Sequence, residues 1–120
     1  MIYRSPTSRF GTKQNKGVSV LKAGDSITVI GRRWFRKSAG NTYTTAEIYV
    51  NGDCVHKTPM QGGYGDHYLT IAGDWLDANG YTARKKHANG SCQPLWQYCR
   101  DEHGIGFVYS VSDVPRERDL

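Results

Sequence analysis

Apolar and polar side chains alternate most regularly over residues 42–50. Ala46, Ile48 and Val50 fall on one side of this alternation, and aromatic or polar residues fall on the other. A period of two with many β-branched and aromatic residues is typical of a strand that buries one face. The pattern therefore predicts such a strand here. Asn51-Gly52 directly after it predicts a type I′ hairpin turn into a further strand at 53–57.

A two-residue turn also fixes which residues face each other across the hairpin. It predicts that Glu47 faces His56, with Cys54 and His56 on the same face of the sheet. Upstream, residues 26–36 alternate in the same way, and residues 37–41 form a connection of hairpin length. Three antiparallel strands are thus expected. The outer face of these strands carries large basic and aromatic side chains, namely Arg32, Trp34, Arg36, Tyr43 and Tyr49.

After residue 65 the apolar spacing changes to that of a helix. Asp66 is placed to cap its start, and Asn79-Gly80 is a typical helix end. Pro94 predicts the start of a second, short helix that ends at Gly104, and residues 105–111 have the pattern of a last strand. We therefore predict an α+β fold, in which an antiparallel sheet of three to five strands carries two helices on one face.

The charge of this 120-residue, single-domain chain is unevenly distributed. Residues 1–60 hold ten Lys and Arg against three Asp and Glu, whereas residues 61–120 hold six against eight. The first 24 residues are polar, basic and without periodicity, so we expect a basic arm at 1–24 and a folded domain at 25–120. A basic excess favours a phosphate-bearing partner, and a surface that only aids solubility is the alternative.

The sequence also indicates a compartment. No apolar run is long enough for a membrane span, and no apolar block near the start has the form of a secretory signal. Cys54, Cys92 and Cys99 do not form the paired framework of a small secreted protein. We therefore expect a cytoplasmic protein that has no membrane partner.

The cysteines, histidines and carboxylates lack the spacing of a catalytic or metal centre. Structural zinc sites usually contain close ligand pairs such as C-x₂-C, and the chain has none. Cys54 and His56 on one strand face would lie about 7 Å apart, beyond hydrogen-bond reach. Asp74 and Asp77, on the polar side of the first helix, are expected to be solvated. We expect no catalytic residue, metal or cofactor, and a metal-dependent or cysteine–histidine enzyme is kept as an alternative.

The candidate binding residues are basic and aromatic side chains of the sheet and of the glycine-rich loop at 62–65. Guanidinium groups bind phosphates, aromatic rings stack on bases, and glycine-rich backbone can form an anion-binding concavity. Packing of the aromatic rings beneath a loop or helix is the alternative, and the basic run at 84–87 is either solvated or a second phosphate contact. The predicted site comprises Arg32, Arg33, Trp34, Arg36, Lys37, Tyr43, Tyr49, Tyr64 and His67.

Three segments carry a resemblance to a known family. They read GRRWFRKSAGNTYTTAEIYVNG, GGYGDHYLTIAGDWL with a following NGY, and PLWQYCRDEHGIGFVYSVSDVPRERDL. Together they cover about residues 25–120 and resemble a family of small uncharacterised proteins of tailed bacteriophages and prophages. The resemblance implies a phage origin and a host bacterial cytoplasm, and it implies no catalytic or binding residues.

These observations lead to one expected function and two alternatives. We expect a non-enzymatic phage accessory protein that binds nucleic acid or a nucleotide-like ligand during host takeover or anti-defence. An inhibitor that docks on a host protein through an aromatic surface is the first alternative. The enzyme described above is the second.

Overall fold

The computed structural model of the chain describes residues 20–120. The expected basic arm at 1–24 falls largely outside this range. Within it, Leu21 is buried in the core, and its N–H donates to the carbonyl of Tyr81 at 2.9 Å. The folded domain therefore begins before residue 25.

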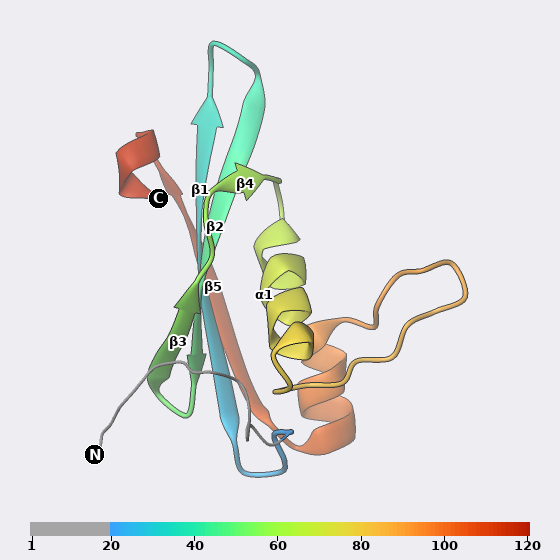
Figure 1. The fold of residues 1–120 in the computed structure, drawn as a ribbon. Coiled ribbons are helices and arrows are strands. Elements are labelled where there is room, and N and C mark those ends of the chain that lie inside the picture. Colours follow the sequence, from blue (N-terminus) through green and yellow to red (C-terminus); the bar gives the residue numbers. More distant parts are fainter. Residues whose placement is uncertain (1–19) are drawn as a thin grey trace.

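One sheet forms a layer of the fold, and helices α1 and η1 lie together on one of its faces (Figure 1). The strands are β1 (Ser26–Arg36), β2 (Asn41–Val50), β3 (Asp53–Lys57), β4 (Gln61–Gly62) and β5 (Gly106–Val114). The helices are α1 (His67–Ala78), the π-helix η1 (Gln97–His103) and a short 3₁₀ turn, η2 (Glu117–Asp119). This architecture confirms the predicted α+β fold. Within residues 20–120 no helix has the length and apolar character needed to cross a membrane.

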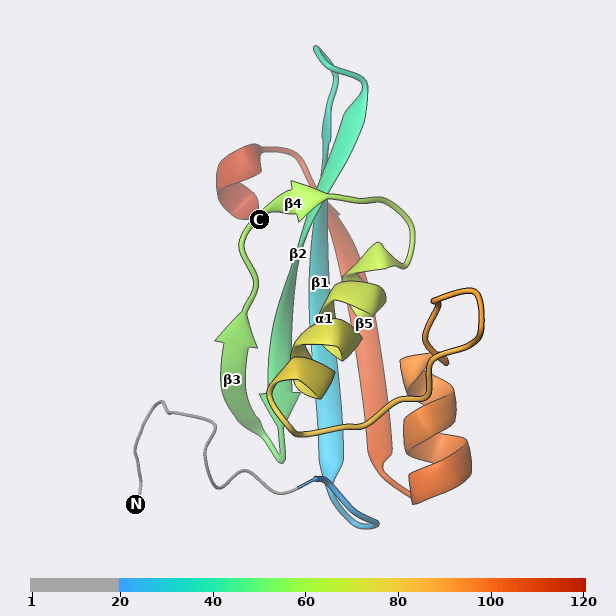
Figure 2. The same ribbon diagram turned by 45° about the vertical axis from the view of Figure 1, so that its right-hand side comes forward.

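The sheet is mixed, with strand order β3-β2-β1-β5 and with β4 also paired to β2. Strand β2 runs antiparallel to β1, β3 and β4, as the hairpin pattern predicts. Strand β5 joins the free side of β1 in parallel orientation, with Ile30 opposite Ser110. Parallel neighbours need a long crossover, which the segment containing α1 and η1 provides (Figure 2).

The β2–β3 hairpin confirms the predicted turn but not the whole predicted register. Asn51 and Gly52 have φ values of 51° and 88°, as a type I′ turn requires. Past Tyr49 the register shifts at a bulge, so Glu47 faces Lys57 and not His56. An extra residue reverses the alternation of side chains beyond it. His56 consequently turns to the helix side and stacks on Trp75 of α1, with ring centroids 4.7 Å apart.

The core lies between the sheet and the two helices. Ile27, Val29 and Ile48 of the sheet are fully buried there. At Gly31 of β1, the ring of Tyr68 from α1 lies directly on the strand backbone. A Cβ atom at this position would lie 2.5 Å from Cδ2 of Tyr68. Glycine at position 31 therefore allows the start of α1 to lie close to the sheet.

We predict that Gly31→Ala lowers the free energy of unfolding by about 1–3 kcal/mol, because the added methyl group overpacks against a buried ring. Urea unfolding at neutral pH measures this change. Gly62→Ala is the matched control, since a Cβ at Gly62 meets no atom within 4 Å. Equal effects of the two substitutions would contradict the close packing of Tyr68 on β1.

Candidate functional site

The structure divides the predicted binding residues between two places. The sheet face turned away from α1 and η1, called the open face, carries five of them: Arg32, Trp34, Arg36, Tyr43 and Tyr49. The remaining four line two hollows beside the β1–β2 hairpin: Arg33, Lys37, Tyr64 and His67. Tyr43 also lines one of these hollows and so belongs to both groups, and the other residues do not lie on one face of the sheet.

The charges of the open face are largely paired within the protein. Arg32 binds Glu47 at 2.7 Å, Tyr49 donates its hydroxyl hydrogen to the same carboxylate, and Lys57 lies 3.8 Å from it. Partial burial raises the pKa of Glu47. Hydrogen bonds from Arg32 and Tyr49, with the charges of Arg32 and Lys57, outweigh burial, and the net pKa lies below the ordinary value. Arg32 is therefore held by an ionised partner.

Trp34 and Tyr43 face each other across β1 and β2 and stack with ring centroids 5.8 Å apart. Both are half-buried. Their rings thus pack on each other across the two strands, and only part of their surface remains for a ligand.

The end of the β1–β2 hairpin projects beyond β4 and beyond the helix layer (Figure 2). Residues 26–46 contain no acidic side chain. At the tip, Arg36 contacts only the hydroxyl of Ser38, and Lys37 has no hydrogen-bond or ion-pair partner among residues 20–120. These two cations are therefore available to an external anion.

A first hollow of about 580 Å³ lies at the hairpin base, between β1, the end of β5 and the glycine-rich loop. Arg33 and Lys37 supply its positive charge, and Phe35 and Tyr64 supply aromatic surface. Arg33 is already engaged, because it donates to Asp113 at 2.7 Å and to the carbonyl of Gly65 at 3.1 Å. This pairing fixes the loop against the sheet, and Lys37 remains as the unpaired cation of the hollow.

A second hollow of about 830 Å³ lies on the other side of Tyr64 and shares that residue with the first. It is lined by the first turn of α1, including His67, and by Tyr43. The ring of His67 rests on Gly63, where a Cβ would overlap the ring carbon Cδ2. Asp66 occupies the expected cap position of α1 but makes no capping hydrogen bond with its side chain. We call the two hollows, with Tyr64 between them, the hairpin site.

Phe35 belongs to this site, although the alternation of β1 assigns it to the buried face with Ile27 and Val29. The structure corrects this, because Phe35 is 54% exposed. Strand β1 continues past the start of α1, so its last residues have no helix to cover them. The sequence hints at this exposure only through the lengths of the two elements. An eleven-residue strand is about twice as long as a twelve-residue helix, so α1 cannot cover all of β1.

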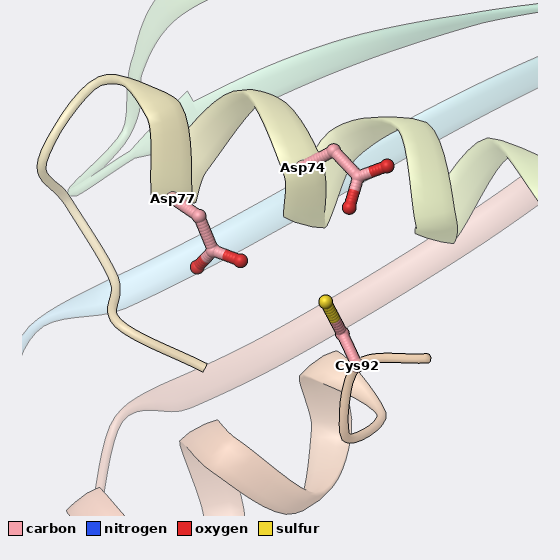
Figure 3. A group of neighbouring side chains, drawn as sticks. All are labelled: Asp74, Asp77 and Cys92. Atoms are coloured by element: carbon pink, nitrogen blue, oxygen red, sulfur yellow. The ribbon is translucent and has the colours of Figure 1, made fainter. Parts of the chain in front are cut away.

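Asp74, Asp77 and Cys92 form the one group of three potential metal ligands among residues 20–120 (Figure 3). A protein cation already occupies this cluster. Arg84, whose side chain is only 4% exposed, binds Asp74 at 2.8 Å and Asp77 at 2.9 Å. The expectation that Arg84 is solvated or binds phosphate is therefore wrong, and Asp77 is largely enclosed, whereas Asp74 is exposed as expected although it is paired. The arginine ties the loop after α1 back onto the helix.

Cys54 and His56 do not form a thiol–imidazole pair. Cys54 stays on the open face and His56 lies on the helix side, because the bulge separates their directions. Burial raises the pKa of Cys99 to about 11, so its thiol is protonated at neutral pH. Burial also lowers the pKa of His56.

The comparisons with known proteins add no relative. The chain matches no protein-family model, no curated protein and no solved structure.

We predict that Arg84→Met lowers the free energy of unfolding by about 2–3 kcal/mol, because two carboxylates lose their buried cation. The exposed position of Asp74 keeps the effect below that of a fully buried pair. Urea unfolding measures it, and Lys85→Met on the same loop, which removes an exposed cation, is expected to cost less than about 0.5 kcal/mol. A stable Arg84→Met protein would contradict the structural role of the arginine.

A second prediction concerns pH. Because the pKa of Glu47 is lower in the folded protein, its ionised form stabilises the fold above the unfolded pKa, and this contribution is lost as the pH falls through the folded pKa. We expect Glu47→Gln to lower stability by about 1 kcal/mol at neutral pH and by progressively less as the pH falls below about 4. Thermal unfolding of both proteins between about pH 7 and pH 3 measures the difference. A difference that is independent of pH would contradict the assignment.

Proposed function

We propose that the protein is a non-enzymatic binding module and that the hairpin site holds an anionic ligand with aromatic bases, namely single-stranded nucleic acid or a nucleotide. The observation that carries this proposal is the combination of unpaired cations and exposed rings at one end of the sheet. Lys37 supplies the charge of the first hollow, with Arg36 beside it at the hairpin tip, and Phe35 and Tyr64 supply the rings. Proteins that bind single strands combine these two features.

The distribution of charge supports the hairpin site over the open face. All eleven acidic residues and twelve of the sixteen basic residues lie in residues 20–120, so this part carries a net charge of only +1. Its affinity for phosphate must therefore come from local groups. Arg32 and Arg33 are bound to Glu47 and Asp113, whereas Lys37 has no partner among the described residues.

The exposed aromatic rings offer surfaces on which bases can stack, in addition to the electrostatic attraction between cations and phosphate. Tyr64 is 81% exposed, on a loop held to the sheet by Arg33, and it separates the two hollows. A base stacked on such a ring contributes about 1–3 kcal/mol, largely independent of its identity. A ring that stands between two hollows suits a ligand with more than one base, in which the phosphate beside a stacked base reaches Lys37.

The resemblance to phage proteins would place this module in an infected bacterial cell, in host takeover or anti-defence. Nucleic acid and nucleotides are abundant there, and a small binding protein could shield or sequester them.

A second candidate function has its own support. The open face combines aromatic surface with paired charges, and Val108 on the same face is 62% exposed. Protein interfaces use such aromatic anchors without needing unpaired cations. On this hypothesis the protein inhibits a host protein that docks on the open face.

Binding of fluorescent single-stranded DNA and RNA, followed by anisotropy, tests the leading proposal. We expect Tyr64→Ala to weaken binding by about tenfold through lost stacking. We expect Lys37→Ala to weaken binding and to reduce the slope of log affinity against log salt by about one phosphate contact. Lys86→Ala is the matched control, since it removes one exposed charge at a distance from the hairpin.

The four basic residues within residues 1–19 would add non-specific attraction in the same assay. The Tyr64→Ala variant distinguishes stacking at the hairpin site from this non-specific attraction, because the substitution leaves every charge in place. If DNA, RNA and nucleotides fail to bind, or if Tyr64→Ala and Lys37→Ala bind as tightly as Lys86→Ala, the proposal is wrong. Capture of a host protein from nuclease-treated lysate, lost on Trp34→Ala, would then favour the second candidate.

A further inference from the structure

Strand β5 forms an open edge of the sheet. Among residues 20–120 it pairs with β1 alone, and Figure 2 shows it on the side of the sheet opposite β3. Its nine residues, Gly106–Val114, leave backbone N–H and C=O groups directed away from β1. An edge of this length is a template for another strand.

The two edges of the sheet differ in how they are protected. The β3 edge is short and carries a bulge and Lys57, all of which hinder pairing with another strand. Strand β5 contains no lysine, arginine or proline. Val108 and Tyr109 on it are 62% and 43% exposed. The sequence therefore blocks further pairing at one edge and leaves the other edge available.

We propose that β5 pairs antiparallel with β5 of a second copy of this chain, about a two-fold axis at Ser110. The two sheets then become one continuous sheet, with the helix layers of both copies on the same side. Such a C₂ contact is self-complementary, because each copy offers the same strand.

The backbone directions fit this register. The N–H of Gly106 donates to Asp25 on the β1 side, whereas the carbonyl of Phe107 accepts a hydrogen bond from Arg100 of η1. Alternate residues point to opposite sides, so the odd-numbered residues of β5 direct their backbone groups to the open edge. With the axis at Ser110, Tyr109 lies opposite Val111 of the second copy, and the two exchange hydrogen bonds.

Ser110 is the middle residue of β5, so this register overlaps all nine residues. At each end the carbonyl of Phe107, which already accepts a hydrogen bond from Arg100, would use its second lone pair for the partner strand. It also places an aromatic ring beside a β-branched side chain, a favourable cross-strand pair. An axis at Val111 would instead place Tyr109 opposite Asp113 and leave the start of β5 unpaired. The full overlap and the apolar pair both favour Ser110.

Charge complementarity points to a second copy as the occupant of the edge. Arg100 lies at one end of β5, 2.7 Å from the carbonyl of Phe107 and over the ring of that residue. Asp113 lies at the other end, and its carboxylate binds Arg33 through one oxygen while its side chain stays 75% exposed. In the Ser110 register Phe107 faces Asp113 of the second copy. Each Arg100 therefore meets an acidic side chain, twice per dimer.

Disulfide formation tests the register in a Cys54→Ser background, which removes the exposed native thiol. Residues opposite each other without hydrogen bonds have Cα atoms about 4.5 Å apart, within the range of a disulfide. We expect Ser110→Cys to form a covalent dimer on mild oxidation. Ser112→Cys, on the same strand face, is the matched control, because the two copies of residue 112 would lie about 13 Å apart and stay unlinked.

Sedimentation equilibrium of the full chain tests the association itself. We expect a mass twice that of the chain, and we expect Ser110→Lys to raise the dissociation constant at least tenfold by placing two charges at the axis. Ala88→Lys, on the exposed loop, is expected to leave it unchanged. Circular dichroism of each variant verifies that it is folded. A monomer at all concentrations up to about 0.5 mM, or equal cross-linking at residues 110 and 112, would overturn the proposal.

Discussion

The ring of Tyr68 on the backbone of Gly31 is the contact on which the arrangement of this domain depends. It allows the first turns of α1 to lie against β1, and it therefore sets the position of the loop that leads into the helix. Arg33, two residues beyond Gly31 on β1, binds the carbonyl of Gly65 in that loop and the carboxylate of Asp113 on β5. Glycine at position 31 thus allows α1, the loop before it and the edge strand β5 to lie in contact with β1. Tyr64 consequently lies on a loop that is held to the sheet.

Ion pairs within the protein engage six of the twelve Lys and Arg side chains of residues 20–120. Arg84 is enclosed between two carboxylates of α1, and Arg32 is bound to Glu47. An arginine that is engaged by carboxylates in this way contributes to the cohesion of the fold and is less available to a ligand. Counting basic residues along the chain therefore overestimates the charge that a partner meets. The unpaired cations at the hairpin tip are few, which predicts modest affinity with a large contribution from stacking.

The sequence specifies the parts of this fold that depend on neighbours along the chain. Alternation and Asn51-Gly52 are enough to predict the three-stranded ribbon, and helical spacing is enough to predict α1. The bulge that turns His56 toward Trp75 depends on packing between β3 and the helix, so local alternation misassigns it. The parallel position of β5 and the burial of Arg84 depend on residues far apart in sequence. The exposure of Phe35 depends on where α1 happens to begin on the strand.

The hairpin site and the β5 edge constrain each other geometrically. Ile30 lies opposite Ser110 in the parallel pair, and Phe35, which lines the hairpin site, lies about five residues farther along β1. At about 3.3 Å per residue, each site would lie roughly 16 Å from the two-fold axis along the strands, and the two sites would lie on opposite sides of it. A dimer would thus hold its two hairpin sites roughly 30–40 Å apart. A ligand shorter than this span would occupy one site at a time, whereas a longer strand could engage both and gain avidity from the linkage. Dependence of affinity on ligand length is therefore a property that follows from the two proposals together and from neither alone.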